Sequence, residues 1–230
     1  MAIIHDTTMS PGKLELLQAW LPAQPWYRGM GQKSRLTKAG GFRLDDPAGA
    51  VGIEFMVVTD GSASPAIAYQ VPMTYRAAAL AEAGDALIGT AEHGVLGTRW
   101  IYDGPQDPVL VAQLVALLAG TAEPQAQNVS NTPEPAVIAH RPPNGALAPA
   151  GTGVSASGPQ GTELRVPTAG PDGRRNGQLL VRINRVLHSG DGTGEAGGPH
   201  VSAAWRLADG AQTRGIFATA AYLPETATAP

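Results

Sequence analysis

The stretch that decides the fold of this 230-residue chain is Trp20-Leu21-Pro22-Ala23-Gln24-Pro25-Trp26-Tyr27-Arg28-Gly29. It holds two of the four tryptophans and follows a segment in which Leu14, Leu17 and Leu21 recur at helical spacing. Proline removes a backbone donor and clashes with the preceding turn, so the predicted helix ends at Pro22. Both rings could stack on a sugar, but core packing is the favoured interpretation. We expect Trp20 to pack this helix onto a sheet, and Trp26 to have a mixed role, because the flanking prolines hold its turn at the surface edge.

Downstream of this stretch the apolar period changes from helical to two. The alternating residues are Val51, Ile53, Phe55 and Val57, then Ile67, Tyr69, Val71, Met73 and Tyr75. A turn cluster at residues 59–65 separates them, which predicts an antiparallel hairpin with one buried face. Residues 95–102 are a third predicted strand. A helix is predicted to begin at Asp107-Pro108 and to end at Gly120.

Residues 131–161 are rich in Pro, Gly, Ala and Ser. Such a composition buries little apolar surface, so we interpret the segment as a linker or long surface loop that is protease-sensitive over about 138–160. Strand patterns return at residues 163–167, 178–187, 201–207 and 215–223. The final segment is therefore predicted to be small and mostly β, with a core that leans on the first unit.

The opening stretch resembles the W-L-x-x-Q-x-W-Y-x-G signature of the N-terminal cap of actinobacterial maltokinases and their glucosamine-kinase relatives. Trp100-Ile101-Tyr102-Asp103-Gly104-Pro105, running into an apolar helix, resembles the same cap. The resemblance implies an α+β fold in which residues 1–130 form a cap-like, helix-flanked, curved antiparallel sheet. A linker at 131–161 then leads to residues 162–230, a small β unit resembling a degenerate kinase N-lobe.

In such kinases, a strand of the form L-K-x-F-R-R carries the phosphate-binding lysine. Residues 179–186 are the best match, and Arg182 occupies the place of that lysine. No lysine follows Lys38, and the sequence stops at Pro230 before any catalytic loop or metal-binding aspartate. Phosphoryl transfer needs those groups, so we expect no catalytic residues and no kinase activity by the chain alone. By resemblance, Arg182 remains a candidate nucleotide contact.

Two further motifs have less specific interpretations. Residues 192–197 match G-x-G-x-x-G, but a strand and not a helix is predicted to follow, so we interpret them as a flexible loop. Glu54 and Asp103 are candidate partners for glycoside hydrolysis, a reaction that depends on a carboxyl separation that sequence does not give.

Composition excludes several classes of function. There is no cysteine, and the five histidines have no metal-ligand spacing, so no metal site is expected. A net charge of −3 gives no general attraction to nucleic acid or to anionic membranes. No export signal or long apolar run is visible, so we expect a soluble cytoplasmic protein without a cofactor.

The resemblance implies a non-catalytic accessory or interaction protein associated with α-glucan, trehalose or maltose 1-phosphate metabolism. It implies a protein partner, with a glucan as a further candidate ligand. Two alternatives stay open. One is the ATP- and Mg-binding half of a split maltokinase-like sugar kinase, and the other is a carbohydrate-binding module. The candidate partner or sugar surface consists of Trp26, Tyr27, Arg28, Lys33 and Arg35.

Overall fold

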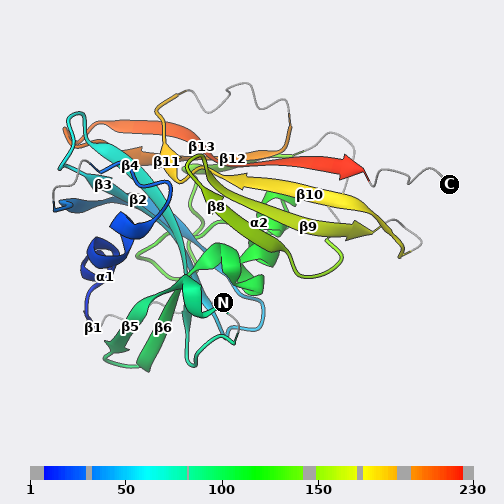
Figure 1. Ribbon diagram of the computed structural model, residues 1–230, viewed down its shortest axis with the longest axis horizontal. Coiled ribbons are helices and arrows are strands. Elements are labelled where there is room, and N and C mark those ends of the chain that lie inside the picture. Colours follow the sequence, from blue (N-terminus) through cyan, green and yellow to red (C-terminus); the bar gives the residue numbers. More distant parts are fainter. Residues whose placement is uncertain are drawn as a thin grey trace.

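The computed structural model describes residues 8–29, 33–81, 83–141, 149–169, 173–190 and 198–224. In these ranges the chain is mostly antiparallel β-sheet with two short α-helices (Figure 1). The predicted loop at 192–197 lies outside the described residues. No helix within the described part has the length and apolarity needed to cross a membrane.

The first half contains strands β1 to β6 and both helices. Their bounds are β1 Met9–Ser10, α1 Lys13–Trp20, β2 Leu36–Asp45, β3 Gly52–Asp60, β4 Ile67–Arg76, β5 Leu87–His93, β6 Gly97–Asp103 and α2 Pro108–Ala119, with 3-10 turns at Leu21–Ala23, Gly84–Ala86 and Gly104–Gln106. The β3–β4 hairpin pairs Gly52 with Tyr75 through Asp60 with Ile67, which confirms the predicted hairpin. The prediction for α2 is also confirmed: Asp107 accepts a hydrogen bond from the amide of Val109, and Gly120 ends the helix at a φ of 71°.

The second half adds seven strands to the same sheet. Their bounds are β7 Val137–His140, β8 Val154–Gly158, β9 Gly161–Ala169, β10 Arg175–Ile183, β11 Val186–Leu187, β12 His200–Arg206 and β13 Gln212–Pro224. The sheet order is β1-β5-β6-β4-β3-β2-β12-β13-β10-β9-β8, with β11 beside β4 and β7 beside β12. The four predicted C-terminal strands are therefore confirmed, and they continue the sheet of the first half.

The linker interpretation of residues 131–161 is wrong for two segments. Residues 137–140 form β7, which pairs with β12 from Val137–Ala203 to His140–His200, and residues 154–158 form β8 beside β9. Strand β7 satisfies its backbone groups by pairing with the distant β12, and β8 does so in a local hairpin with β9, whatever the composition of the segment. Residues 142–148 lie outside the described part.

Strand β3 is buried on both faces, which corrects the prediction of one buried face. Its Phe55 and Val57 pack with α2 and with the second half of the chain, whereas Met56 and Val58 pack beneath α1. In Figure 1, α1 and α2 cover different regions of the sheet. The larger apolar cluster joins residues of β2, β3 and α2 to residues of β9, β10, β12 and β13. The two halves thus share one hydrophobic core.

A buried ion pair crosses this shared structure. Arg185, between β10 and β11, is fully buried, and its Nη2 donates to both carboxylate oxygens of Asp103 at 2.7 and 2.6 Å. Its Nε donates to the hydroxyl of Thr162 at 2.8 Å, and its guanidinium carbon lies 5.0 Å from the ring centre of Trp26. Burial raises the pKa of Asp103 although the guanidinium opposes that effect. Asp103 is therefore held inside the fold by Arg185.

We predict that Arg185→Met lowers the free energy of unfolding by about 3–5 kcal/mol, because it leaves the Asp103 carboxylate buried without its partner. The double variant Arg185→Met/Asp103→Leu is expected to recover most of that loss, because it leaves neither charge unpaired. Urea denaturation measures both. Arg182→Met, an exposed arginine on the neighbouring strand, serves as the control and is expected to change stability by less than about 0.5 kcal/mol. A double variant no more stable than the single one would contradict this account.

Candidate functional site

Trp26 lies in the core, not on a surface. Its side chain is 1% exposed, and its ring centre lies 5.9 Å from that of Trp20 and 5.9 Å from that of Tyr69. Trp20 is only half-buried and packs on the rim of the same cluster. The core packing expected of Trp20 is therefore more complete for Trp26, which follows the 3-10 turn Leu21–Ala23. Trp26 cannot be a platform for a sugar ring.

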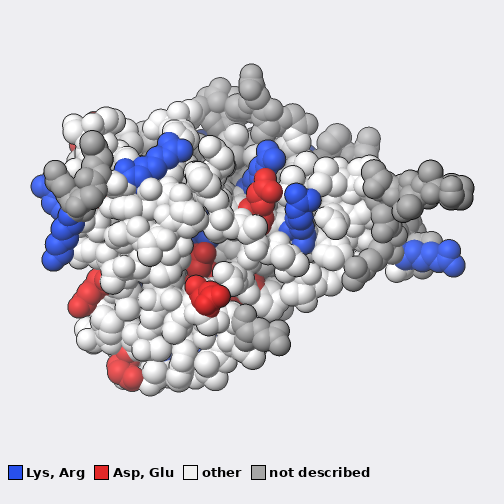
Figure 2. Space-filling view, viewed as in Figure 1, with Lys and Arg blue, Asp and Glu red and all other residues white. Residues whose placement is uncertain are grey.

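The other four residues of the predicted surface have different environments. Tyr27 is half-buried and donates its hydroxyl hydrogen bond to Asp60 at 2.8 Å; burial, reinforced by that bond, raises the pKa of Tyr27 to about 12. Arg28, Lys33 and Arg35 are exposed. Arg35 donates to the carbonyl of Gly61, beside the start of β2, and Figure 2 shows basic side chains along the left edge of that view, where β2 begins in Figure 1. A basic surface remains, without its predicted aromatic centre.

Arg182, the candidate nucleotide contact, is exposed on β10. Its Nε pairs with Glu163 of β9 at 3.0 Å. It lines a shallow hollow of about 840 Å³ with Asn184 and Tyr222 on the β10–β13 part of the sheet. The prediction of a nucleotide contact is not tested by this arrangement, because a surface arginine paired with a glutamate fits a purely structural role equally well.

Glu54 is the centre of a buried polar cluster on β3. Its carboxylate accepts hydrogen bonds from Lys13 at 2.6 Å, from the hydroxyl of Tyr75 at 2.5 Å and from the side chain of Gln127 at 2.9 Å. Burial opposes ionisation of Glu54, but the charge and hydrogen bond of Lys13 and the hydrogen bond of Tyr75 outweigh it and lower its pKa. Glu54 forms an ion pair with Lys13, and Asp103 forms one with Arg185. Neither is placed as a free hydrolytic carboxylate.

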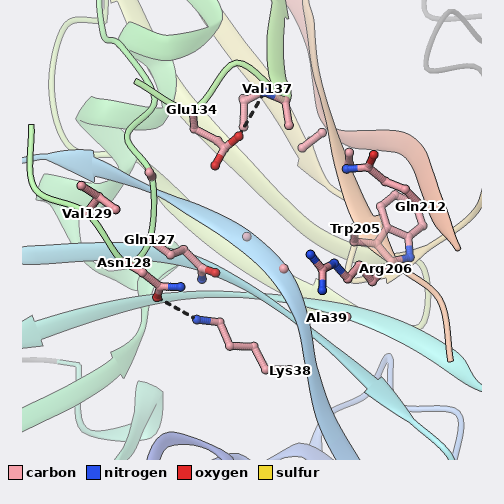
Figure 3. Close-up of a pocket in the computed structure, with 16 residues that line it drawn as sticks. Lys38, Ala39, Gln127, Asn128, Val129, Glu134, Val137, Trp205, Arg206 and Gln212 are labelled. Atoms are coloured by element: carbon pink, nitrogen blue, oxygen red, sulfur yellow. Dashed lines mark hydrogen bonds between the residues drawn. The ribbon is translucent and has the colours of Figure 1, made fainter. Parts of the chain in front are cut away.

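A cavity of about 500 Å³ lies where the two halves of the sheet meet. Strand β12 pairs with β7 through residues 200–203 and then with β2 at the single position Trp205–Gly40. Since β2 and β7 share one edge of β12, they form a fork, and the segment 126–137 crosses it. Figure 3 shows Lys38 and Arg206 on one side of this cavity and Glu134 on the other. We call it the fork cavity.

The polar groups of the fork cavity are held by the surrounding fold. A bulge in β2 between Lys38 and Gly40 shifts the register against β3 at the rim of the cavity. Gln127 is oriented by its bond to Glu54, while the amine of Lys38 lies 3.4 Å from the side-chain oxygen of Asn128 (Figure 3). At Gly41 a Cβ would collide with the carbonyl oxygen of Phe55 and the side chain of Gln127, so only glycine fits there. No motif in the sequence signals this cavity.

Residues 20–107 match the family model of the maltokinase N-terminal cap domain. This part of the chain is a maltokinase N-terminal cap-like domain. The match begins at Trp20 and ends at Asp107, so it includes β2 to β6 and leaves out α2 and β7 to β13. No curated protein gives a significant match to the chain. The cap-like domain supplies Lys38, Gly40 and Gly41 to the fork cavity, and the remainder supplies the other wall.

Among the described residues, no group of three or more histidine, aspartate or glutamate side chains lies close enough to hold a metal ion. The stacked pair His140 and His200, with ring centres 4.1 Å apart, joins β7 to β12.

We predict that Trp26→Ala lowers the free energy of unfolding by about 3–5 kcal/mol, the usual cost of removing a buried large aromatic side chain. Trp20→Ala is expected to cost less, because its ring is only half-buried. Chemical denaturation of both variants ranks the two effects. A larger loss for Trp20→Ala than for Trp26→Ala would contradict the assignment of the core.

Glu54 also predicts a dependence of stability on pH. Its pKa is lowered in the folded state, so its contribution is fully present above the unfolded-state value of about 4.3 and is lost as pH falls through the folded-state value. We expect Glu54→Gln to be less stable than the unmodified protein at pH 7, with the difference narrowing below about pH 4. Thermal unfolding at both pH values tests this. A difference independent of pH would show that packing, not charge, is responsible.

Proposed function

We propose that this protein is a non-catalytic accessory or interaction protein of maltose and α-glucan metabolism. The match of residues 20–107 to the maltokinase N-terminal cap domain carries the proposal. The name of that domain links it to a kinase that acts on maltose. The basic surface formed by Arg28, Lys33 and Arg35 supports a binding role: three exposed cations at one end of β2 suit an acidic partner surface.

The groups in the second half also support a role without catalysis. The strand that resembles the phosphate-binding strand of the kinases presents Arg182, whose planar guanidinium is engaged by Glu163. An arginine does not replace the compact ammonium of a phosphate-binding lysine, and the sequence contains no lysine after Lys38. The proposed role is therefore recognition.

A second candidate function is the ATP-binding half of a split sugar kinase. The observation that favours it is the hollow of about 840 Å³ that Arg182 shares with Asn184 and Tyr222, which is large enough for a nucleotide. The third candidate is a carbohydrate-binding module. The side-chain amides that line the fork cavity support it, because they can hydrogen-bond sugar hydroxyls. They would take the place of the aromatic platform that the sequence suggested.

The first test of the proposed role is a turnover assay. We predict that the purified protein, given ATP, magnesium and maltose, glucose or glucosamine, forms no phosphorylated sugar above background. Arg182→Ala is expected to give the same background. Turnover that falls in Arg182→Ala would overturn the proposal in favour of a kinase.

The second test is identification of the partner. Cross-linking in the native cell, followed by affinity purification, should recover an enzyme that acts on maltose or an α-glucan. The triple variant Arg28→Gln/Lys33→Gln/Arg35→Gln should recover less of it. Recovery of a chain that holds a kinase C-lobe would favour the split kinase, and co-sedimentation with glycogen would favour the carbohydrate-binding module.

A further inference from the structure

The fork cavity has an uneven distribution of charge. Lys38 and Arg206 line it, and among the described residues neither lies within ion-pair distance of a carboxylate. Both are exposed, on strands from the two halves of the chain. Glu134, the one carboxylate that lines the cavity, lies on the opposite side in Figure 3 and accepts a hydrogen bond from the amide of Ala136 at 3.1 Å. One side of the cavity therefore attracts an anion.

The remaining polar groups suit hydroxyls. The side-chain amides of Gln127, Asn128 and Gln212 line the same cavity, and each can both donate and accept. The nitrogen of Gln127 already donates to Glu54, which leaves its oxygen as an acceptor. Glu134 is a further acceptor. A cavity of about 500 Å³ lies in the range that small-molecule sites occupy.

We propose that the fork cavity binds a small anionic polyol of the sugar-phosphate class, with its phosphate between Lys38 and Arg206 and its hydroxyls on the amides and Glu134. The choice of a sugar rests on the proposed function, whereas the choice of an anion rests on two cations, Lys38 and Arg206, for which the described residues supply no salt bridge. Because Lys38 comes from the cap-like domain and Arg206 from β12, the ligand bridges the two halves at the single point where β2 and β12 pair.

Calorimetric titration of the full chain at low ionic strength tests this site. The probes are glucose 1-phosphate, glucose and inorganic phosphate. We expect glucose 1-phosphate to bind at least about tenfold more tightly than either of the others, since only it meets both the cations and the amides. Added salt should weaken its binding, because it screens the attraction of the phosphate.

Three variants that each remove one positive charge distinguish binding in the fork cavity from a general effect of the net charge of the protein. Lys38→Gln and Arg206→Gln are each expected to weaken glucose 1-phosphate binding by about tenfold or more, the effect of losing one charge-assisted hydrogen bond. Arg165→Gln, an exposed arginine of β9 that does not line the cavity, should bind as the unmodified protein does. Unchanged melting temperatures confirm that all three fold.

Each other outcome overturns the proposal. No binding of glucose 1-phosphate, or equal binding by Lys38→Gln and Arg206→Gln, removes the site. If inorganic phosphate binds as tightly as glucose 1-phosphate, the proposed contacts between the sugar hydroxyls and the amides are wrong. Failure of the proposed function is distinguishable: a chain that binds glucose 1-phosphate through Lys38 and Arg206 but recovers no enzyme of maltose or glucan metabolism keeps the site and loses the role.

Discussion

The buried ion pair between Arg185 and Asp103 is a constraint that the joined halves must satisfy, because either charge buried without its partner is strongly destabilising. The two residues are 82 positions apart in the sequence, and Asp103 lies near the end of the cap-like domain. The guanidinium of Arg185 also lies against the ring of Trp26, near the start of that domain. A guanidinium taken out of water is tolerated only with its partner in place, so the cap-like domain and the second half stabilise each other's charges. Next to this pair, the side chain of the buried Gln70 of β4 donates to the carbonyls of Asn184 and Phe217. Buried polar contacts between the two halves therefore continue as far as β13. These buried polar groups are satisfied in this arrangement of the sheet.

This mutual dependence explains which elements could be predicted. The hairpin of β3 and β4 and helix α2 carry their signals locally, in an alternation of apolar residues and in a cap of aspartate, proline and glycine. Strand β2 was not predicted, because Lys38, Gly40 and Gly41 interrupt its alternation. Strand β7 was assigned to a linker for a related reason: its four residues become a strand through pairing with β12. Such pairing is a property of the assembled chain and leaves little trace in the local composition.

The candidate site follows the same division. The exposed cations Arg28, Lys33 and Arg35 could be found in the sequence, because they lie after the aromatic signature in a stretch with several basic residues and no acidic residue, which favours exposure to water. The full burial of Trp26 could not be predicted from the sequence, since it depends on Arg185 and Tyr69, which lie far along the chain. The fork cavity had no signal, because Lys38 and Arg206 are brought together only where β2 meets β12. The sequence identified the cap-like domain; the cavity arises from what that domain packs against.

The position of the fork cavity has a consequence for how the two halves are coupled. In the described part of the chain, β2 and β12 pair at Trp205 and Gly40, beside the fork cavity. The buried pair of Arg185 and Asp103 also joins residues of the two halves, and neither residue lines the cavity. A ligand that binds both Lys38 and Arg206 adds a second connection, and binding to the folded state alone stabilises it by mass action. The two halves are therefore joined without ligand by their shared core and by the pair of Arg185 and Asp103, and a ligand in the fork cavity would add a further connection through Lys38 and Arg206.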